Sequence, residues 1–160
     1  MPYAVEQDGF AIARGVVAES QRLVLLSALG DPDGAGSRGL LAVPGVHAFA
    51  HSEPMMSLVA AYLGPDAYPV RAIFFDKTPT SNWLVPWHQD LTIALASKVE
   101  APGFGPWSMK NGIPHVQPPV ALLAQMIAVR LHLDDCDASN GALRVIPGSH
   151  RVGRLGPDQI

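Results

Sequence analysis

The sequence of 160 residues contains a single cysteine, Cys136. One thiol excludes an intrachain disulfide framework and is typical of a reducing compartment, so we expect a cytoplasmic location. A membrane-spanning run is also lacking, because the longest apolar stretch, Val120 to Leu133, is too short to cross a bilayer and carries Arg130 and His132. The N-terminus has acidic residues where a secretory signal needs positive charge. We therefore expect neither a membrane protein nor a secreted one.

An excess of positive charge is absent as well. The chain has 11 basic and 14 acidic residues, a net charge of -3, so it has no basic stripe to follow a phosphate backbone and nucleic acid is not an expected partner. A hydrophobic fraction of 48% with 16% charged residues is typical of a folded chain of single-domain size. We expect one domain over 1–160, with a helical N-terminal part (1–66) and a β core (67–160).

Two stretches of the N-terminal part predict helices. The first runs from Glu19 to Leu29 with apolar residues near helical spacing and ends at Gly30. The second has Ser52 as its expected N-cap, Glu53 and Pro54 in the first turn, and Gly64 at its end.

Strand-forming stretches dominate the second half of the chain. They begin at Tyr68, Trp87 and Met126, and Asn140-Gly141 predicts a hairpin after the last of them. The segment 97–119 is rich in proline and glycine from Glu100 onward, which predicts an irregular loop that serves as a lid or a binding loop. Helices first and strands afterwards favour an α+β fold with a β-sandwich or jelly-roll core.

The stretch "PWHQDLT" from Pro86 carries an imidazole and a carboxylate at alternate positions, His88 and Asp90. In a strand the two would project from one face, with Gln89 on the other. A histidine and a carboxylate begin the 2-His-1-carboxylate set that binds Fe(II) and leaves coordination positions open. The alternative is a hydrogen-bonded or ion-paired surface duo.

Three stretches together resemble the phytanoyl-CoA dioxygenase family of Fe(II)/2-oxoglutarate oxygenases: 74–95 with its "WHQD", 105–119, and 129–155 with its "NGALRVIPGSH". The resemblance implies a double-stranded β-helix, a cupin-like jelly roll, and hydroxylation of a small organic substrate with Fe(II), 2-oxoglutarate and O2. It implies His88 and Asp90 as two metal ligands. The family's third ligand, a histidine, and its 2-oxoglutarate arginine lie well beyond "PGSH", and neither can appear before Ile160. We therefore expect a jelly roll that is incomplete at its C-terminal end and self-associates through an uncovered sheet edge.

Further candidates follow with their structural alternatives. His150 is a substitute third ligand, or else a residue that fixes its own turn. Lys77 and Thr92 are candidates for the 2-oxoglutarate carboxylate, or else a solvated lysine and an ordinary strand threonine. Gln89 and Trp107 are candidates for substrate binding, although Trp107 can equally anchor its loop.

Two other functions stay open at this point. One is an inactive, shortened binding or scaffold domain. The other is a cupin-like metal enzyme that uses His88, Asp90 and His150 without 2-oxoglutarate.

Overall fold

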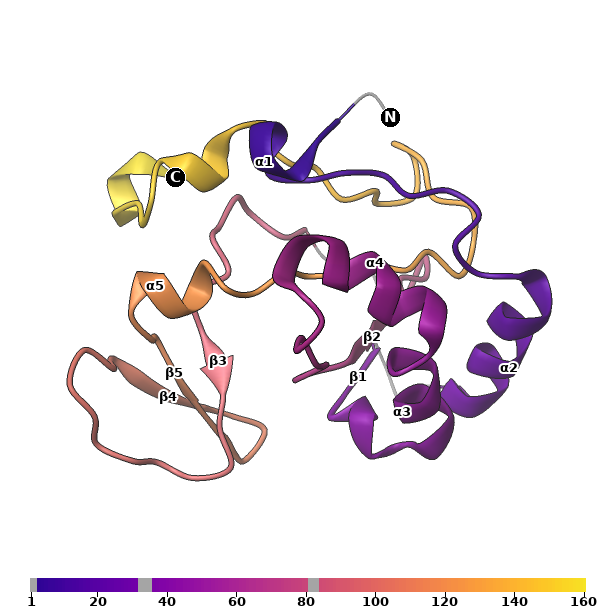
Figure 1. Ribbon diagram of the computed structural model, residues 1–160, viewed down its shortest axis with the longest axis horizontal. Helices are drawn as coiled ribbons and strands as arrows, with labels where there is room; N and C mark the ends of the chain where they lie inside the picture. Colours follow the sequence, from indigo (N-terminus) through magenta and orange to yellow (C-terminus); the bar gives the residue numbers. More distant parts are fainter. Residues whose placement is uncertain (1–2, 32–35, 81–83) are drawn as a thin grey trace.

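The structure, a computed structural model, describes residues 3–31, 36–80 and 84–160. Most of the α-helices lie in the first half of the sequence, and short antiparallel strands occur in both halves (Figure 1). The α-helices are α1 Val5–Asp8, α2 Glu19–Leu29, α3 Pro44–Ala50, α4 Glu53–Leu63 and α5 Val120–Leu123. The strands are β1 Gly36–Arg38, β2 Ile73–Phe75, β3 Ile93–Ala94, β4 Trp107–Lys110 and β5 Ile113–Val116, and the 3-10 turns are η1 Leu40–Ala42, η2 Ser149–Arg151 and η3 Pro157–Gln159.

Helices α2 and α4 begin and end where the sequence predicts. Gly30 and Gly64 follow their last turns with φ of 61° and 84°, a conformation that favours glycine and ends a helix. Ser52 is the N-cap residue of α4, but its hydroxyl makes no capping hydrogen bond and is buried without a partner among the described residues. The position of that cap was predictable, and the hydrogen bond expected of it is not formed.

Helix α3 was not predicted. It begins at Pro44, where the fixed φ of proline suits a first turn, and it packs against α2 so closely that a Cβ on Gly45 would lie 2.7 Å from that of Ala28. The buried residues Leu25, Leu40 and Val46 join α2, η1 and α3 in the main core. Seven partly buried side chains complete this core: Leu29, Val43, Phe49, Ala72, Phe74, Leu131 and Leu133.

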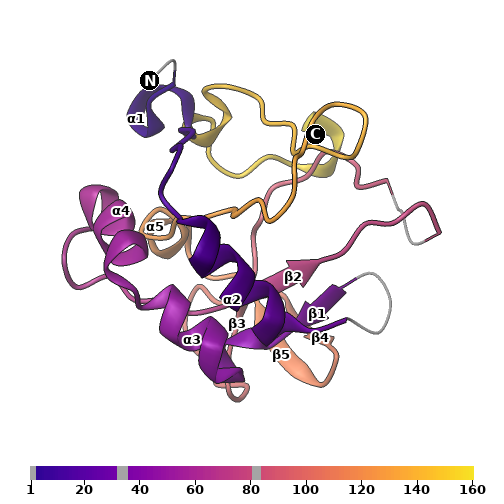
Figure 2. The same cartoon turned by 90° about the vertical axis from the view of Figure 1, so that its right-hand side faces the viewer.

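The strands form two small antiparallel sheets. Strands β1 and β2 pair with Ser37 opposite Phe74, and this sheet lies beside α3 (Figures 1 and 2). The other sheet has the order β3-β5-β4. The α+β expectation is confirmed, and the described residues show these two sheets without a closed barrel or jelly roll.

The segment predicted to be an irregular loop contains a regular hairpin, and that prediction was wrong. Strands β4 and β5 pair from Trp107 opposite Val116 to Lys110 opposite Ile113. The two residues between them, Asn111 and Gly112, have φ of 49° and 75°, as a two-residue hairpin turn requires.

The hairpin predicted at Asn140-Gly141 is not formed. Asn140 instead closes a polar turn, because its side chain accepts a hydrogen bond from the Asp137 amide at 2.8 Å and donates one to the Asp135 carbonyl at 2.7 Å. Hydrogen bonds from the Ser139 hydroxyl and amide lower the pKa of Asp137 in the same turn. Local side-chain bonds therefore replace a strand ladder here.

The stretch from Met126 to Asp135, predicted as a strand, is irregular. Its side chains still alternate, since Leu131 and Leu133 contribute to the core while Arg130 and His132 are exposed.

The C-terminal part lies beside α1 in both views (Figures 1 and 2). The Gly148 amide donates to the Asp8 carbonyl at 2.9 Å, and the Arg151 guanidinium donates to the carbonyls of Glu6 and Gln7 at 3.0 and 2.7 Å. Among the described residues, no helix is long and apolar enough to cross a membrane.

Candidate metal centre

His88 and Asp90 lie in an irregular segment that leads into β3, and not in a paired strand as predicted. Their side chains nevertheless share one side of the chain, with Nε2 of His88 3.7 Å from Oδ1 of Asp90. Two ligand atoms in adjacent positions on one metal ion, each about 2.1 Å from it, lie about 3 Å apart. A small side-chain rotation therefore brings the pair to a chelating separation.

A local hydrogen bond orients the imidazole ring of His88. Its Nδ1 lies 2.9 Å from the Pro86 carbonyl oxygen, which can only accept, so Nδ1 carries the proton. In the neutral ring this leaves the lone pair on Nε2, the atom that faces Asp90. Such a bond from the second ring nitrogen is the usual support of a metal-ligating histidine.

Both side chains are open to solvent, 53% for His88 and 96% for Asp90. A pair this exposed contributes little to folding, since water screens its attraction, and it is accessible to an ion from solution.

The neighbouring side chains tie this segment to the C-terminal part of the chain. The Gln89 amide donates to the Gly153 carbonyl and its oxygen accepts from the Leu155 amide, both at 2.8 Å. The Arg144 guanidinium lies over the Trp87 ring at 5.1 Å from its centroid. Gln89 is therefore engaged with backbone, and its predicted role in substrate binding stays a prediction.

Sequence reasoning missed Arg71, a cation in the surroundings of Asp90. Burial, and then the positive charge of Arg38, lower the pKa of Arg71, while the carboxylate of Asp90 opposes them. The only signal in the sequence was a lone arginine two residues before β2.

The candidates for contact with 2-oxoglutarate and the substrate, Thr92, Lys77 and Trp107, each lie beside other side chains or backbone. Thr92 Oγ1 accepts a hydrogen bond from Lys110 Nζ at 3.4 Å, which places a cation beside a hydroxyl. Lys77 lies beside Gly141, where an added Cβ would be 3.4 Å from its Cδ. Trp107 begins β4 with Lys98 Nζ 5.8 Å from its ring centroid, and its buried Nε1 has no partner among the described residues.

His150 does not join His88 and Asp90. Its ring packs on Gly9, and its Nε2 lies 3.3 Å from the Glu6 carbonyl oxygen. No group of three His, Cys, Asp or Glu side chains that could hold a metal ion occurs among the described residues. The three-residue site of the cupin-like alternative is therefore not assembled.

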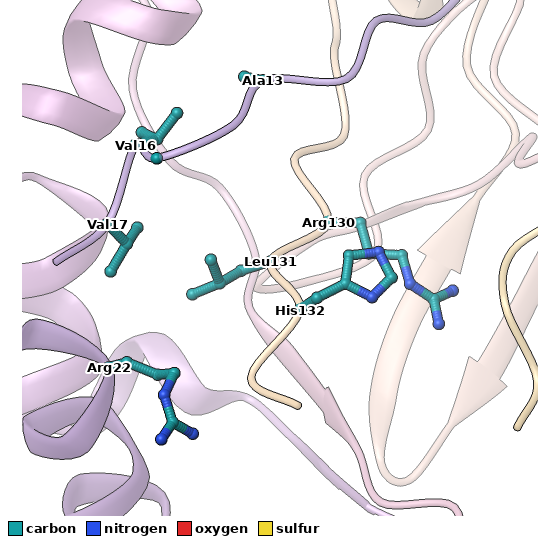
Figure 3. Close-up of a pocket in the computed structure, with 8 residues that line it drawn as sticks. Ala13, Val16, Val17, Arg22, Arg130, Leu131 and His132 are labelled. Carbon is teal, nitrogen blue, oxygen red and sulfur yellow. The ribbon is translucent and has the colours of Figure 1, made fainter. Parts of the chain in front are cut away.

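A cavity of about 220 Å³ lies elsewhere, between the segment 13–17, α2 and the segment 130–132. Leu131 points toward α2, whereas Arg130 and His132 project from the other side of their segment (Figure 3). Arg22, which also lines the cavity, is held by Glu19 and by the Leu133 carbonyl. The lining of the cavity does not include His88 or Asp90.

Comparison with known proteins gives one family. The family model described as phytanoyl-CoA dioxygenase (PhyH) matches residues 29–155, which include His88, Asp90 and the "PGSH" turn. No curated protein and no solved structure matches the chain.

Proposed function

Because the chain belongs to the phytanoyl-CoA dioxygenase family, we propose that it takes part in an Fe(II)- and 2-oxoglutarate-dependent hydroxylation of a small organic substrate, with His88 and Asp90 as metal ligands. The observation that carries the proposal is the Nδ1 hydrogen bond of His88 to Pro86, which leaves Nε2 free beside Asp90.

The ligand types of His88 and Asp90 fit Fe(II), but the pair provides two ligands where the facial triad has three. Imidazole and carboxylate are two members of the facial triad of non-haem iron oxygenases, and that triad needs a second histidine. The described residues bring no third ligand to the pair. We propose that His88 and Asp90 supply two ligands, and that the family's third ligand and its 2-oxoglutarate arginine are missing from these 160 residues.

The chemistry that the bound group supplies is the oxidation of a C–H bond: substrate, 2-oxoglutarate and O2 become hydroxylated product, succinate and CO2. The chain's own residues hold and orient the components. His88 and Asp90 would hold the ion through an imidazole nitrogen and a carboxylate oxygen. Lys77 and the Thr92–Lys110 pair are the proposed contacts of the 2-oxoglutarate carboxylate, because each offers a cation. Trp107 and Gln89 are the proposed contacts of the substrate.

Metal binding tests the proposal without knowledge of the substrate. Anaerobic calorimetry with Fe(II) is expected to show binding that is at least tenfold weaker in His88→Ala and in Asp90→Asn, since loss of an outer-shell partner alone costs about 10–100-fold. His132→Ala, an exposed histidine of the cavity, is the matched control and is expected to bind like the parent. Equal affinity in all four proteins would contradict the assignment.

Turnover tests the count of ligands. The 160-residue chain with Fe(II), ascorbate and 2-oxoglutarate is expected to form no succinate by itself, because the third ligand and the 2-oxoglutarate arginine are lacking. Succinate formed by the chain and not by His88→Ala would show that the site is complete within these residues. Absence of succinate together with absence of Fe(II) binding would favour the shortened binding domain.

A further inference from the structure

Two exposed histidines four residues apart lie at the C-terminal end of α3, His47 within the helix and His51 as its C-cap residue. Their rings are stacked, with centroids 4.1 Å apart and an angle of 26° between the planes. Both residues are exposed, while Val46 of the same helix is buried in the core. The pair is therefore held side by side and open to solvent.

One ring is already oriented for ligation. Nδ1 of His51 lies 2.9 Å from the His47 carbonyl oxygen, which can only accept, so this nitrogen carries the proton. The lone pair of the neutral ring is then on Nε2, the nitrogen that does not take part in the contact with the His47 carbonyl. This is the support that a ligating histidine takes from its second nitrogen.

The helix that presents the pair is fixed in place. Val46 is buried among the core residues, Phe49 packs against the same core, and Gly45 lies against Ala28 of α2. A site on a packed element loses little conformational freedom when it binds an ion.

We propose that His47 and His51 form a second, independent cation site, a two-imidazole chelate for a borderline-soft divalent ion of the Ni²⁺, Cu²⁺ or Zn²⁺ class. Two histidines at i and i+4 on one helix face meet on a single ion, because that spacing brings the side chains together. Imidazole nitrogen suits these ions better than Fe(II), and without a carboxylate the site differs in preference from His88 and Asp90. The described residues supply no third ligand, so water fills the remaining positions.

The test uses Ni²⁺ alone as the probe and a parent that lacks the other candidate centre, the double variant His88→Ala/Asp90→Asn. Calorimetry on this parent is expected to show one Ni²⁺ per chain. Either His47→Ala or His51→Ala, added alone to this parent, is expected to weaken Ni²⁺ binding at least tenfold. Loss of an outer-shell partner costs about 10–100-fold in metal affinity, and loss of one of two ligands is expected to cost at least as much. Adding His132→Ala, from the cavity, is expected to change nothing.

A second measurement separates ligation from folding. Both positions are exposed, so the variants are expected to keep the helical circular dichroism of the parent, and Ni²⁺ is expected to raise the melting temperature of the parent but not that of His51→Ala. Ni²⁺ affinity in His51→Ala equal to that of the parent would overturn the proposal, as would binding that only His132→Ala abolishes. Because the parent lacks His88 and Asp90, failure here leaves the proposed iron centre untouched, and the reverse also holds.

Discussion

The Gln89 side chain links the segment that carries His88 and Asp90 to the C-terminal part of the chain. Its amide nitrogen donates to the Gly153 carbonyl, and its amide oxygen accepts from the Leu155 backbone amide. A single residue between His88 and Asp90 thus connects positions more than sixty residues apart.

We expect Gln89→Ala to lower the free energy of unfolding by about 1–3 kcal/mol, because two hydrogen bonds of about 0.5–1.5 kcal/mol each are lost. The Leu155 amide should then exchange its hydrogen faster, and hydrogen exchange read by NMR checks this. Gln125→Ala, which removes a bond only to the nearby Ala121 carbonyl, is the control and should leave Leu155 unchanged. Unchanged exchange in Gln89→Ala would show that the link does not hold the segment.

Gly9 is the residue on which α1 and the His150 turn meet. It has φ of 83°, and a Cβ there would lie 2.5 Å from Nδ1 and 3.2 Å from Cβ of His150, so the whole ring would have to move. Both the backbone conformation and the close approach require glycine.

We therefore expect Gly9→Ala to destabilise the protein by more than the roughly 1–2 kcal/mol of a left-handed alanine alone. Gly39→Ala isolates that cost, because Gly39 has φ of 70° with nothing within 4 Å of an added Cβ. Urea unfolding of both variants compares their free energies of unfolding. The Gly148 amide hydrogen should exchange with solvent faster only in Gly9→Ala, since that amide donates to the Asp8 carbonyl. Equal destabilisation would mean that the His150 contact contributes nothing.

At the scale of elements, α2 holds the irregular segment 130–133 through one arginine. Arg22 Nη1 donates to the Leu133 carbonyl at 2.6 Å, and the same guanidinium binds both carboxylate oxygens of Glu19 at 2.7 and 2.8 Å. The hydrogen bonds that Arg22 donates to the Glu19 carboxylate lower the pKa of Glu19 and raise the pKa of Arg22.

We expect Arg22→Gln to return the pKa of Glu19 toward its ordinary value of 4.5, as measured by NMR titration of the carboxyl group. Glu19 has a lower pKa in the folded state, so its contribution to stability is present above pH 4.5 and is lost as the pH falls through the folded-state value. The stability difference between parent and variant should therefore shrink on acidification. Arg14→Gln is the control, and an identical Glu19 titration in parent and Arg22→Gln would refute the pairing.

At the scale of the whole molecule, the chain exposes far more surface than its mass requires. Its accessible area is 11375 Å² at 17.0 kDa, whereas a compact monomer of that mass exposes about 7,700 Å². Among residues 3–31, 36–80 and 84–160, five hydrophobic side chains are buried, and large ones such as Leu84 are exposed. Strands β3 and β4 are also edges of their sheet. Surface of this extent and kind favours pairing with a second copy.

We expect the isolated chain to self-associate, as measured by light scattering, and a lysine on an edge strand to reduce it. Met109→Lys on β4 tests this, with Val24→Lys on α2 as the matched control, since both residues are 66% exposed. Dissociation by Met109→Lys alone would assign the contact to the sheet edge. A monomer in the parent would contradict the prediction.

Local chemistry explains what the sequence determined by itself. The ends of α2 and α4 depend on glycines next to an amphipathic run, and the shared side of His88 and Asp90 depends on alternate positions and on a hydrogen bond only two residues back. The hairpin at Asn111-Gly112 carried an equally local signal, which the density of prolines around it outweighed in the prediction. The α+β class and the family were predictable for the same reason.

Only the tertiary structure decided the rest. The stretch from Met126 has the alternation of a strand, yet a strand exists only where a neighbour supplies its hydrogen bonds, and here the apolar side chains pack on the helices instead. His150 was within reach of Asp90 by spacing alone, but its contacts with Gly9 and Glu6 hold it against α1. Pairing partners and remote ligands depend on which distant segments meet, and no local pattern encodes that.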